Sequence, residues 1–319
     1  MFNLKLFPFI HSITDLDFTE NVLLRDTVQT LDCMKASKAV EAQLSAVLLH
    51  IYGQLFSQRQ SFLLLARNAP MHGLLTSLRT SLKLEPATAS DQTFHFKLIN
   101  ELEKSVQFML QILGRPNASF ADMGVAVEQI VGRQSQCGDI KGEVNISEDH
   151  SLVLACAWLN IKEACLLSSE LRSTSPEVIE RAGQLLIKVL TSTRHKGVLE
   201  AAAVALSDFC CHLLTSGEHS HFPEIWLNDV IDSLENHAAS VTRRSAGLPL
   251  LVRSLVSSEE RGSSGGRHLL TLAVTKLLAI LEKGQSIHSS SSETEDVPQC
   301  HALHVLRYVI LTKCYLRFF

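Results

Sequence analysis

The most constraining feature of the sequence is a pair of long segments that are apolar on almost every side. Residues 152–167 (LVLACAWLNIKEACLL) and 198–214 (VLEAAAVALSDFCCHLL) suit helices but carry no continuous polar stripe. A helix of this kind has to be covered by other elements on more than one side. The segment that follows Pro176 differs, because its apolar residues recur at helical spacing on one stripe, as expected of an amphipathic helix.

Helix starts recur along the chain at a regular interval. Helices are predicted to begin near residues 149, 176, 196, 222, 240 and 265, and taken in pairs the units start near 149, 196 and 240. Such spacing matches HEAT and armadillo repeats, which run to about 40–47 residues. Further helices are predicted near 18–35, 39–57, 69–83 and 93–113. We therefore predict an all-α fold, a HEAT/armadillo-type α-solenoid of stacked antiparallel helix pairs.

Two polar stretches interrupt this pattern. One is Gly-rich and follows the helix near 93–113, and the other is Ser-rich and acidic (GQSIHSSSSETED). Both compositions are typical of solvated connections. The predicted organisation is an N-terminal helical-repeat segment at 1–113, a polar loop at 114–148, a second helical-repeat segment at 149–283, a linker at 284–297, and a C-terminal helix with a divergent tail at 298–319.

Composition excludes several classes of protein. The chain has 319 residues, 46% hydrophobic and 19% charged, which gives ample material for a large core and excludes a disordered segment. The eight cysteines form no CxxC pair, which favours a reducing compartment. No uninterrupted apolar run reaches the roughly 18 residues of a membrane span, and the N-terminus lacks the pattern of a signal peptide. We expect a cytoplasmic protein with no membrane contact.

Enzyme signatures are missing from the sequence. It contains no GxGxxG, Walker A, HExxH or GxSxG motif. A group of metal-ligand types does occur, at Cys210, Cys211, His212, His219 and His221. The two cysteines are adjacent on a helix and point about 100° apart, so buried cysteines beside a polar loop are favoured over a zinc site. We expect neither a catalytic residue nor a bound metal.

One heptapeptide stands out from the helical pattern. It lies in a predicted helix at 241–257 and comprises Arg243, Arg244, Ser245, Ala246, Gly247, Leu248 and Pro249. Gly and Pro cost about 1 and 3 kcal/mol relative to Ala inside a helix, so a structural or functional reason is expected. Pro249 predicts a kink, and the Ala-Gly pair would allow another helix or a phosphate to approach the backbone closely.

Positive charge collects around the heptapeptide. Residues 241–283 carry a net charge of +4, whereas the whole chain carries −4. A second basic group, Arg194 and Lys196, lies at the turn before the preceding unit. Equivalent turns of successive solenoid units line one edge, so both groups could contribute to one patch that binds tRNA or a partner. Equally compatible is that Arg243 and Arg244 are ordinary solvated residues at a helix start.

The heptapeptide at 243–249 resembles the signature of the thyroid adenoma-associated protein (THADA) family. Further resemblance follows in the same order along the chain. It runs through Ala157-Trp158 with Lys162-Glu163, Arg194 to Gly197, Trp226-Leu227, and Val297 to Gln299 with His301 to Leu303, and a weaker match lies upstream at Pro70 to Gly73.

The resemblance implies a function that the residues alone do not. Members of the family are non-catalytic partners of an FtsJ-type tRNA 2′-O-methyltransferase, and direct ribose methylation in the tRNA anticodon loop. S-adenosylmethionine is then expected on the partner enzyme, and this chain needs no cofactor. Its few Trp and Tyr residues favour contacts to the RNA backbone over base stacking.

Two departures from the family are visible in the sequence. Family members are several-fold longer, and residues 308–319 (YVILTKCYLRFF) do not resemble them. The chain therefore looks like a truncated or alternative form. The alternative function is a general HEAT-repeat protein interaction scaffold that makes no contact with RNA.

Overall fold

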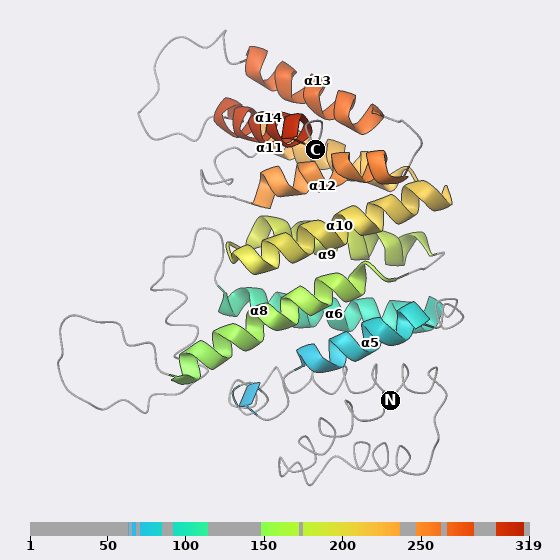
Figure 1. Cartoon of the computed structure of the whole chain (residues 1–319), viewed down its shortest axis with the longest axis vertical. Helices are drawn as coiled ribbons and strands as arrows, with labels where there is room; N and C mark the ends of the chain where they lie inside the picture. Colours follow the sequence, from blue (N-terminus) through green and yellow to red (C-terminus); the bar gives the residue numbers. More distant parts are fainter. Residues whose placement is uncertain are drawn as a thin grey trace, which may run out of the picture. The chain divides into compact units, whose positions relative to one another are not determined.

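The computed structural model describes residues 63, 66–67, 71–84, 92–113, 148–171, 175–236, 247–262, 267–283 and 298–315. Within them the chain forms nine α-helices and no strand, which confirms the predicted all-α class (Figure 1). The helices are α5 (His72–Leu84), α6 (Gln92–Ile112), α8 (Glu148–Ser168), α9 (Pro176–Ser192), α10 (Lys196–Ser216), α11 (Phe222–Asn236), α12 (Gly247–Gly262), α13 (His268–Lys283) and α14 (Pro298–Tyr315).

Most helix boundaries lie where the sequence predicts them. Helices α9, α10 and α11 begin at Pro176, Lys196 and Phe222 as predicted, and α8 begins at Glu148. Helix α12 differs, because it begins at Gly247 and not near 240. The predicted helices at 18–35 and 39–57, the loop at 114–147 and the linker at 284–297 lie outside the described residues.

The chain divides into two compact units, Met1–Ala182 and Gly183–Phe319, with the boundary inside α9. In the first unit α8 packs against both α5 and α6. Ion pairs join α5 to α8 at Arg79–Glu163 (3.4 Å) and Lys83–Glu170 (2.8 Å). Partners further along α5 meet partners further along α8, so the two helices run parallel.

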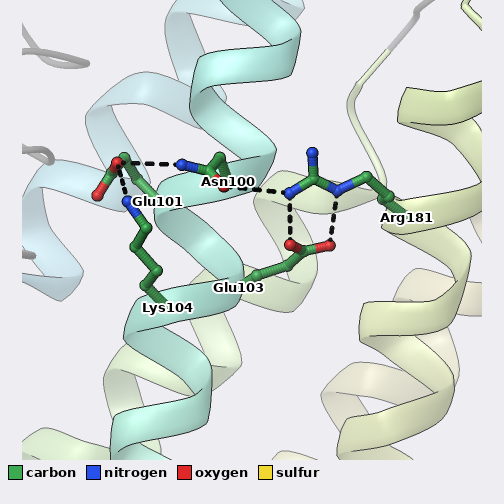
Figure 2. A network of polar contacts seen from close by, with 5 residues as sticks. All are labelled: Asn100, Glu101, Glu103, Lys104 and Arg181. Carbon is green, nitrogen blue, oxygen red and sulfur yellow. Dashed lines mark hydrogen bonds and ion pairs between the residues drawn. The ribbon is translucent and has the colours of Figure 1, made fainter.

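A polar network fixes the first turns of α9 against α6 in the same unit (Figure 2). The Arg181 guanidinium donates to both carboxylate oxygens of Glu103, at 3.0 and 2.5 Å, and to the Asn100 side-chain oxygen at 3.3 Å. It also lies 5.0 Å from the centroid of the Phe96 ring. A two-point contact with a carboxylate sets both the position and the orientation of the guanidinium, so the network fixes the register of the helices.

In the second unit the most extensive helix contact joins α10 to α12, and α12 also packs against α14. A second set of contacts joins α11 to α13 through His268–Glu224 (3.3 Å) and Lys276–Asp232 (2.8 Å). The partners in both pairs are separated by the same number of residues, so α11 and α13 run parallel and in register. Helices two apart along the chain thus lie side by side within this unit.

The core of the second unit is built around Trp226, which is fully buried. Its indole stacks on Phe222 and on Phe209, with ring centroids 5.4 and 6.2 Å apart. Gly183 makes room for it, because a Cβ at that position would lie 2.2 Å from the Trp226 Cζ2 atom. The space that a side chain would fill on α9 is therefore occupied by the indole ring.

The two helices that are apolar on nearly every side are covered as predicted. Helix α8 packs against α5 and α6, and α10 packs against α11 and α12. Both are long and apolar enough to cross a membrane by length and composition alone. Their most apolar windows are nevertheless 56% and 50% buried inside the protein, as in core helices.

Replacing Gly183 by alanine should lower the free energy of unfolding by about 1–3 kcal/mol, because the new methyl group overlaps the Trp226 ring. Alanine otherwise favours a helix by about 1 kcal/mol. The matched control is Gly73→Ala in α5, where nothing lies within 4 Å of the new Cβ and no loss is expected. Urea unfolding of both variants tests this, and a Gly183→Ala protein as stable as the unaltered chain would contradict it.

Candidate functional site

The end of the heptapeptide is a packing element of the second unit. Gly247, Leu248 and Pro249 are all buried in the first turn of α12. A Cβ at Gly247 would lie 1.7 Å from the Leu190 carbonyl oxygen in α9 and 3.0 Å from a methyl group of Leu199 in α10. The backbone of α12 therefore approaches that of α9 at a distance that only glycine permits.

This geometry decides whether a helix or a phosphate approaches the backbone at Gly247, and it corrects the predicted kink at Pro249. The close approach at Gly247 is made by another helix. The kink predicted at Pro249 is wrong, because Pro249 is the third residue of α12 and not an interior one. Backbone N–H groups in the first turn have no carbonyl partner within the helix, so proline loses no hydrogen bond there. Gly247, Leu248 and Pro249 are buried in the first turn of α12, and their assignment to tRNA or partner binding stays a prediction.

The other four residues of the heptapeptide, Arg243, Arg244, Ser245 and Ala246, lie outside the described residues. Their assignment to tRNA or partner binding stays a prediction. Arg244 is nevertheless only three residues from Gly247 along the chain, which limits the separation of their Cα atoms to about 11 Å.

The turn between α9 and α10 carries the second predicted basic group. Arg194 and Lys196 are both exposed, and Lys196 makes a solvent-accessible ion pair with Glu200 at 3.7 Å. No described carboxylate pairs with Arg194. Since Leu190 and Leu199 flank this turn and both contact Gly247, the start of α12 lies beside the turn that carries Arg194 and Lys196.

His195 holds this turn in shape by capping α10. Its Nδ1 atom accepts a hydrogen bond from the Val198 backbone N–H at 3.4 Å. The backbone N–H of His195 donates to the Thr193 hydroxyl at 3.2 Å. Burial lowers the pKa of His195 below its ordinary value of 6.5. A neutral imidazole is what the cap requires, because a protonated ring has no acceptor nitrogen.

The cysteine and histidine group near 210–221 lies at the edge of the hydrophobic core. Cys210 is completely buried, and burial raises the pKa of its thiol. The His221 ring stacks on Phe222 with centroids 4.5 Å apart. Within the described part of the chain, no three His, Cys, Asp or Glu side chains are grouped closely enough to hold a metal ion.

A polar cluster in the first unit was missed by sequence reasoning. Glu163 of α8 is 8% exposed, forms the ion pair with Arg79 of α5, and acts electrostatically on His72 at the start of α5. Burial is the larger effect on His72 and lowers its pKa, while the negative charge of Glu163 opposes that change. The weak resemblance at 70–73 and the stronger one at 162–163 thus meet in space, a contact that helical periodicity alone does not reveal.

Comparison with known proteins assigns the family. The family model described as THADA/TRM732, DUF2428 matches residues 93–314, more than half of the chain and including the heptapeptide. The chain belongs to this family. The resemblance noted in the sequence is thereby confirmed, and the match extends from α6 to α14.

Curated relatives in the THADA/TRM732 family carry names that state a function. The "tRNA (32-2′-O)-methyltransferase regulator THADA" of Gallus gallus is 26% identical over 246 residues, and the human protein of the same name is 26% identical over 245. Each alignment covers 70% of this chain but only 12% and 11% of the relative. The "tRNA (32-2′-O)-methyltransferase regulator trm732" of Schizosaccharomyces pombe is 23% identical over 169 residues, covering 50% of this chain and 11% of the relative. No solved structure matches the chain.

Replacing Gly247 by alanine should destabilise the second unit by about 1–3 kcal/mol, because the new methyl group overlaps a backbone oxygen that no rotamer change can move aside. The matched control is Ser257→Ala on the half-exposed side of α12, where a change within about 0.5 kcal/mol is expected. Urea unfolding measures both. Equal stability of the two variants would show that α12 and α9 do not make this close approach.

The stability of the chain should fall between neutral and mildly acidic pH, in part through His195. Because its folded pKa is lowered, its contribution is complete above about pH 6.5 and is lost as the pH falls through the folded value. His195→Asn keeps a capping oxygen without the titration, so its unfolding free energy should fall less between pH 7.5 and 5. Identical pH dependence of the two proteins in urea unfolding would exclude a role for this cap.

Proposed function

We propose that this chain is a non-catalytic scaffold segment that regulates 2′-O-ribose methylation of tRNA by a partner methyltransferase. The observation that supports this most is the family match over residues 93–314, together with relatives named as tRNA (32-2′-O)-methyltransferase regulators. The chain spans about one eighth of those relatives' length. Its share of their activity is therefore part of the proposal.

In this proposal Arg194, Lys196, Arg243 and Arg244 form a basic corner of the second unit, which contacts the phosphates of the tRNA anticodon stem-loop or the partner enzyme. Gly247 places the start of α12 beside the turn that carries Arg194 and Lys196. Arg243 and Arg244 precede that start along the sequence, and the proposal assigns their side chains to the same binding surface. Arginine offers a planar set of donors that matches a phosphate at two points. Several such contacts would orient the RNA without reading its sequence.

We propose further that the helices form a HEAT/armadillo-type α-solenoid. Within the second unit α10 contacts α12, α12 contacts α14, and α11 contacts α13. Contact between helices two apart is the arrangement expected when helix pairs stack as repeats. Such an array offers a long surface on which RNA and enzyme can be held together.

The same proposal assigns different roles to the methyltransferase and to this chain. An FtsJ-type methyltransferase would bind S-adenosylmethionine and carry out the transfer of the methyl group. This chain would position the anticodon loop so that the ribose at position 32, the position in the relatives' names, reaches that enzyme. Holding two reactants in the correct geometry can lower a barrier substantially without any chemical group from the scaffold. The proposed site of action is the cytoplasm.

Replacing both Arg243 and Arg244 by alanine should reduce ribose methylation at position 32 by at least ten-fold, because two phosphate contacts are removed. The assay combines the full chain, the methyltransferase, labelled S-adenosylmethionine and a tRNA transcript. The matched control is the pair Arg261→Ala, near the end of α12, and Arg267→Ala, directly before α13, which removes the same charge elsewhere in the second unit. Unchanged methylation by the Arg243 and Arg244 variant would contradict the assignment. An equal loss in both variants would also contradict it, because the effect would then come from the net charge of the chain and not from these two positions.

The alternative, a scaffold that binds only protein, makes a different prediction for salt. Phosphate contacts release counterions, so the logarithm of the tRNA affinity should fall linearly with the logarithm of the salt concentration. Gel shifts at two salt concentrations measure this. A chain that captures the methyltransferase but shows no tRNA affinity, alone or in the complex, would favour the protein-only scaffold.

A further inference from the structure

Arg253 in α12 and Tyr308 in α14 form a cation–π pair at the surface of the second unit. The guanidinium carbon lies 5.9 Å from the centroid of the phenol ring. Arg253 is exposed, and Tyr308 is half-buried beneath it. The residues on either side of Arg253 along α12, Val252 and Ser254, are buried, so Arg253 projects from an otherwise covered stretch of helix.

A guanidinium stacked on a ring keeps its binding capacity. The ring contacts the flat face of the group, whereas its N–H donors lie in the plane and point outward. Stacking also limits the rotamers of a long side chain, so less conformational entropy is lost when a ligand binds. Arg253 is thus prepositioned to donate to an anion.

The described residues around this pair offer neither Arg253 nor Arg307 a carboxylate partner. Helix α14 contains no Asp or Glu, and it contributes a second exposed arginine, Arg307, next to Tyr308. The carboxylate of Glu259 on α12 is occupied, because it accepts the backbone N–H groups of His268 and Leu269 at 2.8 Å each. No described carboxylate forms an ion pair with Arg253 or with Arg307.

Two other cations of the second unit are each paired with a carboxylate. Arg261 pairs with Asp208 at 2.8 Å, and Lys276 pairs with Asp232 at 2.8 Å. Arg253 and Arg261 are therefore exposed arginines on one helix with opposite electrostatic situations. Arg253 is therefore available to an anionic partner, whereas Arg261 helps to join two helices.

We propose that Arg253, Arg307 and Tyr308 form a second RNA contact that takes backbone phosphates of the bound tRNA. The inference rests on the proposed function and extends it, because Arg253 lies six residues beyond Gly247, or about 9 Å along the axis of α12. An RNA held at the basic corner would have to be held elsewhere too if its orientation is to be fixed. The half-buried Tyr308 ring supplies an apolar side against which a ribose or base can lie.

The test is tRNA binding by the full chain together with the methyltransferase, measured by fluorescence anisotropy with a labelled tRNA transcript over a range of salt. Arg253→Gln and Arg307→Gln should each weaken binding about 5- to 8-fold at 0.1 M salt and reduce the slope of log affinity against log salt by about 0.7–0.9. Tyr308→Phe should bind like the unaltered chain. Arg261→Gln is the matched control on α12 and should leave the slope unchanged, with circular dichroism confirming that every variant is folded.

The possible failures can be told apart. Normal tRNA binding by Arg253→Gln, with weakened binding when Arg243 and Arg244 are replaced, would overturn this inference and leave the proposed function standing. Weakened binding to the methyltransferase with an unchanged tRNA slope would also overturn it, and would assign the surface to a protein. No tRNA binding by the unaltered complex would remove the proposed function and this inference together.

Discussion

The close approach of α12 to α9 at Gly247 is the contact on which the rest of the second unit depends. The Leu190 carbonyl oxygen occupies the space where any other residue would place its Cβ, so the two backbones meet directly. From that seat α12 runs along α10, and its Glu259 carboxylate receives the first N–H groups of α13. The anchoring of α12 thus sets the placement of the helices that follow.

The same packing explains how the electrostatics of the unit are divided. Asp208 and Asp232 are used to join parallel helices, and the Glu259 carboxylate caps a helix start. Arg261 and Lys276, which pair with the two aspartates, therefore each have a carboxylate beside them. Arg194 and Arg253, which have no described carboxylate partner, then carry the positive surface. A net charge of −4 for the whole chain is therefore compatible with a local surface that binds phosphate.

Helix class and most helix starts could be predicted from the sequence because their causes are local. Ser175 and Pro176 mark the start of α9, and apolar periodicity marks its length. The start of α12 was not predictable in this way, because Gly247 and Pro249 look like helix breakers until a neighbouring backbone explains the glycine. The pairing of Arg253 with Tyr308 was also invisible, since helical periodicity shows which residues face outward but not which exposed residues of different helices meet.

The buried end of the heptapeptide packs against residues of one neighbouring turn, and this bears on how the motif works. The three atoms nearest to a Cβ at Gly247 belong to Leu190 and Leu199, on either side of one turn. In the proposed repeat array each unit would contact only its neighbours, so this close approach would depend on adjacent helix pairs and not on distant parts of the protein. A motif with buried Gly, Leu and Pro beside two arginines then has a simple division of labour. The buried half packs against α9 and α10, and in the proposed function the charged half binds tRNA. The two halves should therefore respond differently to substitution: Gly247 in stability, and the arginines in tRNA affinity.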